Sequence, residues 1–249
     1  MGLRKRILRS LEPLPGPTTT GRDPYRLLAY FLGKARKPIV FDVGCNEGLS
    51  TAKLLRLLPH ATIHGFEPSP ATAGRCRARF ANDPRVTIHQ QALGSAPGQM
   101  TLHTHAGGET DSLLADGAAF SKLTPADWAQ ARERVTVEVE TVDRTAAKLG
   151  LDRIDLLKSD AQGFDDRVLE GARGMMSRSA VGVVYTEMIF AALYAGQARP
   201  HALISQLEAL GFRLVGLFDV HYETGPAISW CDALFIHESR LASANTPGP

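Results

Sequence analysis

Short apolar runs alternate with amphipathic runs along most of the chain. Runs rich in valine, isoleucine and leucine predict strands, over residues 38–44, 61–68, 85–94, 154–160 and 180–188. Runs with apolar residues at helical spacing predict helices, over residues 48–59, 69–83, 164–174 and 200–211. Apolar strands separated by helices are typical of a mostly parallel sheet with helices on both faces. The pattern therefore predicts a doubly wound α/β fold.

The middle and the end of the sequence follow a different pattern. Apolar and polar residues alternate over 98–106 and 134–142, which predicts half-exposed strands with a loop-rich stretch between them. Two further strands, over 212–218 and 227–237, are expected to close the fold. The loop expected between these two strands holds His221.

The first residues differ in composition from the rest of the chain. Three prolines and the stretch TTTG precede residue 22. We therefore expect a basic, proline-rich extension over 1–21, a single folded domain over 22–238 and a flexible C-terminal tail over 239–249. Four basic residues lie among apolar ones between Met1 and Leu11. The extension is either a short helix in weak contact with an anionic membrane surface or a solvated terminus.

Composition narrows the class of protein. With 249 residues, 44% hydrophobic, the chain is long enough to bury a full core. A net charge of +2 gives no general attraction to nucleic acid, so no nucleic-acid partner is expected. The cysteines, Cys45, Cys76 and Cys231, lack the spacing of a zinc site and favour a reducing compartment. No apolar run is long enough for a transmembrane segment or signal peptide, so we expect a cytoplasmic protein.

A glycine-containing turn follows the first strand, in the stretch FDVGCNEGLST. Such a turn brings the backbone close to a ligand at the strand ends. The dinucleotide fingerprint requires a second glycine, but Asn46 stands there and only Gly44 and Gly48 remain. Asp42, just before the glycines, suits the cationic end of an amino-acid tail better than a pyrophosphate.

The acid that ends the second strand narrows the choice of ligand. Glu67 lies 19 residues after Gly48 and can accept hydrogen bonds from both hydroxyls of an adenosine ribose. NAD and S-adenosylmethionine both offer those hydroxyls, but only the latter replaces the pyrophosphate with an amino-acid tail. S-adenosylmethionine is therefore the predicted cofactor. The alternative is that Asp42 and Glu67 are ordinary strand-end acids.

Five stretches, in order, resemble the FkbM family of class I methyltransferases across roughly residues 38–237: FDVGCNEGLST, FEPSP, QALG, IDLLKSDAQGFDDRVLEGA and WCDALF. The longest is the most specific, since the family motif there reads close to K-x-D-V-E-G followed by V-L-x-G-A. The resemblance implies a Rossmann-like seven-stranded sheet, mostly parallel with a terminal antiparallel strand. It also implies S-adenosylmethionine as methyl donor and O-methylation, often of sugars or natural products. Gln91 and Ala92 match the segment that borders the adenine.

Two residues depart from the family pattern. Cys45 replaces a small residue, usually alanine, and Gln162 replaces the glutamate of the longest motif. The first change conserves size. The second removes a charge near the expected reaction centre, so an altered or lost activity stays open.

Methyl transfer to an alcohol requires a group that accepts its proton. Asp160 ends the fourth parallel strand, where ligands of doubly wound folds bind, and is the predicted catalytic base; its alternative role is a helix cap. Glu187, Tyr194 and His221 are predicted to contact a small-molecule or glycan substrate. Asp160 and Glu187 could together hold Mg²⁺, but without an obvious third ligand no metal site is assigned.

Three other functions remain open. A methyltransferase acting on protein or nucleic acid often carries an Asn/Asp-Pro-Pro-aromatic tetrapeptide after the fourth strand, where this chain has SDAQGF. A cofactor-binding module with lost catalysis would be explained by Gln162. An NAD-dependent oxidoreductase is disfavoured by Asn46 and Asp42.

Overall fold

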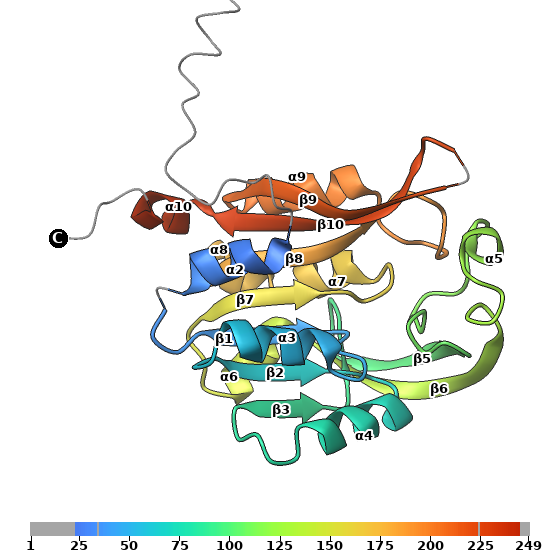
Figure 1. Cartoon of the computed structure of the whole chain (residues 1–249), viewed down its shortest axis with the longest axis horizontal. Helices are drawn as coiled ribbons and strands as arrows, with labels where there is room; N and C mark the ends of the chain where they lie inside the picture. The colour runs from blue at the N-terminus through green and yellow to red at the C-terminus, as the bar shows by residue number, and fades with distance from the viewer. Residues whose placement is uncertain (1–22, 34, 224, 245–249) are drawn as a thin grey trace, which may run out of the picture.

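A seven-stranded sheet forms the centre of the computed structural model, which describes residues 23–33, 35–223 and 225–244 (Figure 1). The strand order is β3-β2-β1-β7-β8-β10-β9. The strands are β1 (Ile39–Val43), β2 (Thr62–Phe66), β3 (Val86–His89), β7 (Ile154–Ser159), β8 (Val181–Ile189), β9 (Phe212–Tyr222) and β10 (Ile228–His237). Only β10 runs antiparallel to its neighbours, β8 and β9. The predicted α/β fold, with an antiparallel last strand, is confirmed.

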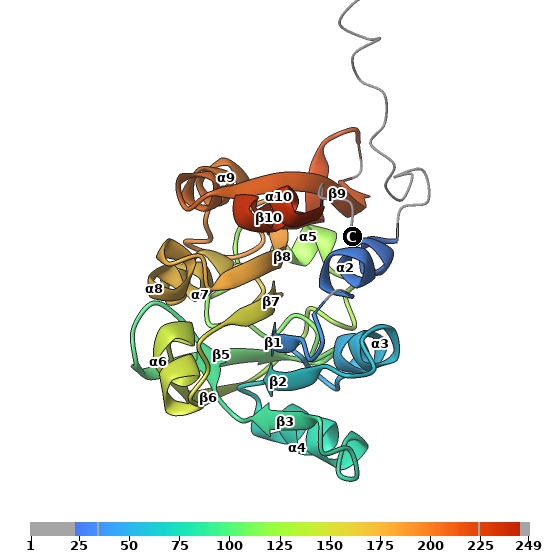
Figure 2. The same ribbon diagram turned by 90° about the vertical axis from the view of Figure 1, so that its left-hand side faces the viewer.

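Helices cover both faces of this sheet (Figure 2). One face carries α6 (Val142–Lys148), α7 (Asp165–Glu170), α8 (Arg173–Ser177) and α9 (Pro200–Ala209). The other carries α2 (Pro24–Leu32) and α3 (Leu49–Leu57), with α4 (Pro70–Arg79) beside β3. The central strands β7 and β8 are buried along their whole length, which explains their continuous apolar runs.

The helix expected over 164–174 is divided into α7 and α8 around Gly171. A Cβ at Gly171 would lie 2.0 Å from the carbonyl oxygen of Gly94. Glycine therefore permits the close approach of this corner to the end of β4.

A second sheet of three strands was not expected from the sequence. It has the order β4-β6-β5, with β4 (Ala92–Leu93), β5 (Gly98–His105) and β6 (Ala131–Glu140). The strand expected over 85–94 is divided between β3 in the large sheet and β4 in the small one. The short helix α5 (Phe120–Leu123) lies in the connection from β5 to β6, on the side toward which β2, β3 and β7 point (Figure 1).

The prediction that His221 lies in a loop is wrong. β9 continues to Tyr222, and His221 pairs with Trp230 of β10. Register shifts between Trp230 and Asp232 leave two residues of β9 opposite one of β10, and Asp219 there has a φ of 45°. Such a bulge lets an irregular sequence continue as a strand.

The structure tests few of the domain boundaries predicted near the two ends of the chain. The basic extension over 1–21 lies outside the described residues. β10 is followed directly by α10 (Glu238–Ala244), which overlaps the C-terminal tail expected over 239–249. The boundary at 238 stays a prediction. Among the described helices, none has both the length and the apolar character needed to cross a membrane.

Candidate active site

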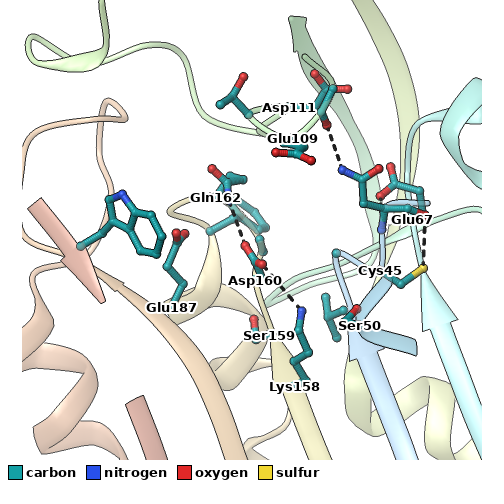
Figure 3. A pocket seen from close by; sticks show the side chains of 18 of the residues that line it. Cys45, Ser50, Glu67, Glu109, Asp111, Lys158, Ser159, Asp160, Gln162 and Glu187 are labelled. Carbon is teal, nitrogen blue, oxygen red and sulfur yellow. Dashed lines mark hydrogen bonds and ion pairs between the residues drawn. The ribbon is translucent and has the colours of Figure 1, made fainter. Parts of the chain in front are cut away.

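A cavity of about 950 Å³ lies at the carboxyl ends of the parallel strands. This is the edge where ligands of open α/β sheets bind. Eight predicted residues line it: Gly44, Asn46, Glu67, Ala92, Asp160, Glu187, Tyr194 and His221. The other three, Asp42, Gly48 and Gln91, are not among its lining residues. Figure 3 shows Glu67 and Glu187 on opposite sides of Asp160.

The turn after β1 is tight because of its backbone angles. Gly44 has a φ of 69°, and a Cβ there would lie 1.9 Å from the carbonyl oxygen of Asp160. Asn46 has a φ of 48°, which asparagine tolerates better than most residues. Gly44 thus lets the ends of β1 and β7 meet at the cavity. Gly48, at the start of α3, packs against Cys76 and Phe80 instead.

Glu67 is held at the cavity by backbone donors. Its Oε2 accepts from the Asn46 amide at 3.1 Å and its Oε1 from the Ser69 amide at 2.8 Å. The residue is 7% exposed, and burial raises its pKa to about 7, although the bond from Ser69 opposes the shift. Each carboxylate oxygen keeps acceptor capacity, so the residue fits a pair of ribose hydroxyls.

Asp42 is fully buried and has protein partners. Its Oδ2 accepts from the hydroxyls of Ser50 at 2.8 Å and Thr51 at 2.6 Å, and its Oδ1 lies 3.3 Å from the Lys158 ammonium. These contacts anchor α3 and β7 to β1. Contact of Asp42 with the cationic end of a ligand stays a prediction.

Lys158 is a functional candidate that the sequence reasoning did not select. It is the one lysine in the buried strand β7, and its ammonium lies between Asp42 and Asp160, 3.7 Å from the latter. Burial alone lowers the pKa of Lys158, but the two carboxylates outweigh burial and raise it. A lysine within an apolar strand was the signal that could have identified it.

Asp160 belongs to a chain of hydrogen bonds that ends at Tyr194. The side-chain amide of Gln162 donates to Asp160 Oδ1 at 2.9 Å, and the Tyr194 hydroxyl donates to Gln162 Oε1 at 2.6 Å. The Asp160 side chain remains 42% exposed. It is therefore fixed from two sides and open to the cavity, as a proton acceptor requires.

Glu187 lies in β8 beside several acids. It is 8% exposed, and within the described part of the chain its Oε2 has no hydrogen-bond partner. Burial, followed by the charges of Asp160 and Asp165, raises its pKa well above the usual range for glutamate. Asp165 itself accepts from Ser159 and from the Ala161 amide at the start of α7.

The loop over 107–112 covers one side of the cavity. Asn46 donates to the Gly108 carbonyl at 3.4 Å, and Asp111 accepts from the His105 amide at 2.7 Å. Ser112 donates to the Gln162 carbonyl at 2.7 Å. The loop therefore connects the turn after β1 with the residues that hold Asp160.

The described residues offer no site for Mg²⁺. Among residues 23–33, 35–223 and 225–244, no three His, Cys, Asp or Glu side chains form a group that could hold a metal ion. Glu187 and Asp160 lack a third ligand in this part of the chain.

The sheet order and the glycine turn after β1 fit the fold of class I methyltransferases that use S-adenosylmethionine. The family model for the methyltransferase FkbM domain matches residues 42–214, and the chain belongs to this family.

Curated relatives agree with this class. The chain is 28% identical to 2-O-methyltransferase NoeI of Sinorhizobium fredii over 222 residues, covering 88% of this chain and 89% of the relative. It is 28% identical to Methyltransferase 1 of Beauveria bassiana over 147 residues, which cover 53% of this chain and 57% of the relative.

Solved structures of methyltransferases are also similar. The N-terminal domain of EvdMO1, determined in the presence of S-adenosylhomocysteine and D-fucose, matches with a TM-score of 0.45 at 13% identity, covering 95% of this chain and 97% of that one. Magnesium protoporphyrin IX methyltransferase from Synechocystis matches with a TM-score of 0.43 at 13% identity, and the match covers 86% of this chain and 77% of that one.

Proposed function

We propose that this enzyme transfers the methyl group of S-adenosylmethionine to a hydroxyl of a saccharide or glycosylated small molecule. The observation that carries the proposal is the position of Asp160, between the Glu67 side and the Glu187 side of one cavity (Figure 3). The curated relative that covers most of the chain is named a 2-O-methyltransferase, which supports oxygen as the acceptor atom.

The residues around Glu67 form the donor side. When bound, S-adenosylmethionine supplies a methyl group activated by the adjacent sulfonium. Glu67 would accept from the ribose hydroxyls, and the backbone at Gly44 lets the ligand lie close to the strand ends. Ala92 and Leu93 of β4 offer an apolar wall for the adenine, and Gln91 adjoins them without lining the cavity.

Asp160 would accept the proton of the acceptor hydroxyl as the new carbon–oxygen bond forms. An alcohol is too weak an acid to ionise alone at neutral pH, so a positioned carboxylate assists the transfer. Gln162 and Lys158 hold the carboxylate in place, and the reaction then depends on aligning the hydroxyl with the methyl group.

Aromatic side chains line the remaining side of the cavity. Trp230 stacks on His221 with a ring separation of 3.7 Å, and both line the cavity together with Tyr194 and Tyr185. Flat aromatic surfaces with polar edges suit the CH faces and hydroxyls of a sugar ring. In this proposal Tyr194 serves mainly to position Gln162, since its hydroxyl is already engaged.

The test is methyl transfer from isotopically labelled S-adenosylmethionine into a cell lysate, which is then separated into glycan, lipid, small-molecule, protein and nucleic-acid fractions. We expect label in glycans or glycosylated small molecules. Label confined to protein or nucleic acid would contradict the proposed acceptor. No label in any fraction, with donor binding intact, would favour a binding module.

A further inference from the structure

We infer that the acceptor carries an ammonium group on the sugar ring that is methylated, and that Glu187 binds this group. The enzyme would then be specific for an amino sugar or a glycoside of one. This inference rests on the proposed function and assigns the substrate class of the same cavity.

The charges around the cavity are unbalanced. Among the described residues, eight carboxylate side chains line it but only three lysine or arginine side chains, and each of those three already has a carboxylate partner. Lys53 pairs with Asp23, Arg75 with Glu47, and Lys158 with Asp42 and Asp160. S-adenosylmethionine brings only one net positive charge. Glu187 and Asp232, on the acceptor side, therefore form no ion pair with lysine or arginine in the described chain.

Glu187 is the carboxylate that most needs a positively charged partner. It is 8% exposed and lines the cavity, and in the described chain its Oε2 has no hydrogen-bond partner. A buried carboxylate without a partner is costly, and a cationic group that enters with the ligand would offset that cost. By contrast, Asp232 accepts from the Tyr185 hydroxyl at 2.5 Å.

The surroundings of Glu187 favour an organic cation. Across the antiparallel pair, Glu187 lies opposite Asp232, and Trp230 lies two residues farther along the same face of β10. An aromatic ring beside carboxylates attracts ammonium groups. A metal ion would require a third ligand, and the described residues provide no such group.

The titration of Glu187 supports the same ligand. The acids near it are Asp160, directly after β7, Asp165 of α7 and Asp232 of β10, and Lys158 of β7 is the nearby cation. Burial comes first among the causes that raise the pKa of Glu187, and the charges of Asp160 and Asp165 follow. An ammonium group bound beside Glu187 would favour the ionised form of this side chain and would share its positive charge with the neighbouring carboxylates.

The test uses the full chain, labelled S-adenosylmethionine and the glycan and glycosylated small-molecule fraction of a lysate. Half of this fraction is N-acetylated with acetic anhydride in water, which converts amines to neutral amides and spares hydroxyls. We expect the wild type to transfer at least about tenfold more label to the untreated half than to the acetylated half. Acetylation removes one charged contact with the enzyme, and a loss of about this size is usual for such a contact. Equal labelling of the two halves would overturn the inference while leaving saccharide methylation intact.

Two variants complete the test. Glu187→Gln should label both halves equally, whereas Glu208→Gln, which changes an exposed acid on α9, should keep the wild-type preference. Unchanged binding of S-adenosylhomocysteine verifies that each variant is folded. A Glu187→Gln protein that retains the preference would overturn the role of Glu187. No label in either half, with donor binding intact, would contradict the proposed function and the inference with it.

Discussion

The side-chain amide of Gln162 donates to Asp160 Oδ1 at 2.9 Å. Gln162 stands where the FkbM motif has glutamate, and a carboxylate there would have no hydrogen to donate. The departure from the family pattern thus changes how the predicted base is held. In this chain Gln162 also accepts from Tyr194, so the amide uses both of its polar atoms.

Gln162→Glu should lower turnover, by about tenfold or more, because two carboxylates would face each other where a donor now holds Asp160. Steady-state kinetics with the labelled donor would measure this change. Tyr194→Phe is the milder control, since it removes only the hydroxyl that holds Gln162. Higher turnover in Gln162→Glu would mean instead that the departure from glutamate is damaging.

Asp160→Asn should retain donor affinity and lose turnover by about 10²- to 10⁴-fold, the usual contribution of a general base. Asp166→Asn is a matched control, because Asp166 pairs with Arg167 and does not line the cavity. Calorimetry with S-adenosylhomocysteine and single-turnover labelling would separate binding from chemistry. A fully active Asp160→Asn protein would refute the role of Asp160 as base.

Donor affinity should rise with pH up to about 7. Burial raises the pKa of Glu67 to about 7, and ribose hydroxyls donate better to the ionised carboxylate. Below that pH, each unit should weaken binding by up to about tenfold. Glu67→Gln should bind about tenfold or more weakly at pH 8 and lose the pH dependence.

The control for Glu67 is Glu138→Gln in β6, whose carboxylate accepts from Gln99 and lies outside the cavity lining. It should follow the wild-type curve. Titrations with S-adenosylhomocysteine between pH 5.5 and 8 would provide the data. If Glu67→Gln bound the ligand as tightly as the wild type, the ribose assignment would be wrong.

Asp165 should make the free protein less stable as pH rises toward 6. Burial raises its pKa from 3.8 to about 6, so the folded state holds a proton that the unfolded state releases. Its favourable contribution is complete below pH 3.8 and falls by up to about 3 kcal/mol as pH passes through 6. Asp165→Asn should therefore gain stability relative to the wild type between pH 4.5 and 7 in urea unfolding; a constant difference would contradict this.

Lys158→Met should destabilise the protein by about 3–5 kcal/mol, because it leaves the fully buried Asp42 without its cation. The double variant Lys158→Met with Asp42→Asn should recover part of that loss, since the uncompensated charge is gone. Urea unfolding of both proteins would measure the difference. A double variant no more stable than the single one would show that Lys158 acts mainly through Asp160.

The fold was predictable where short-range pattern decides structure. β1, β2, β7 and β8 are buried on both faces, so their apolar runs mark them without knowledge of their partners. β4 was not predictable in this way. Its two residues continue the predicted strand that begins with β3, and only their pairing with Val139 and Glu140 places them in a different sheet.

The sequence by itself determined the α/β order, the glycine turn and the acid at the end of β2, because these follow from residue type and spacing along one stretch of chain. Tertiary structure alone decided that Lys158 lies between Asp42 and Asp160, that Gln162 connects Asp160 to Tyr194, and that His221 stacks on Trp230. These relationships depend on strand order, register and bulges, which bring distant residues together and which no local pattern encodes.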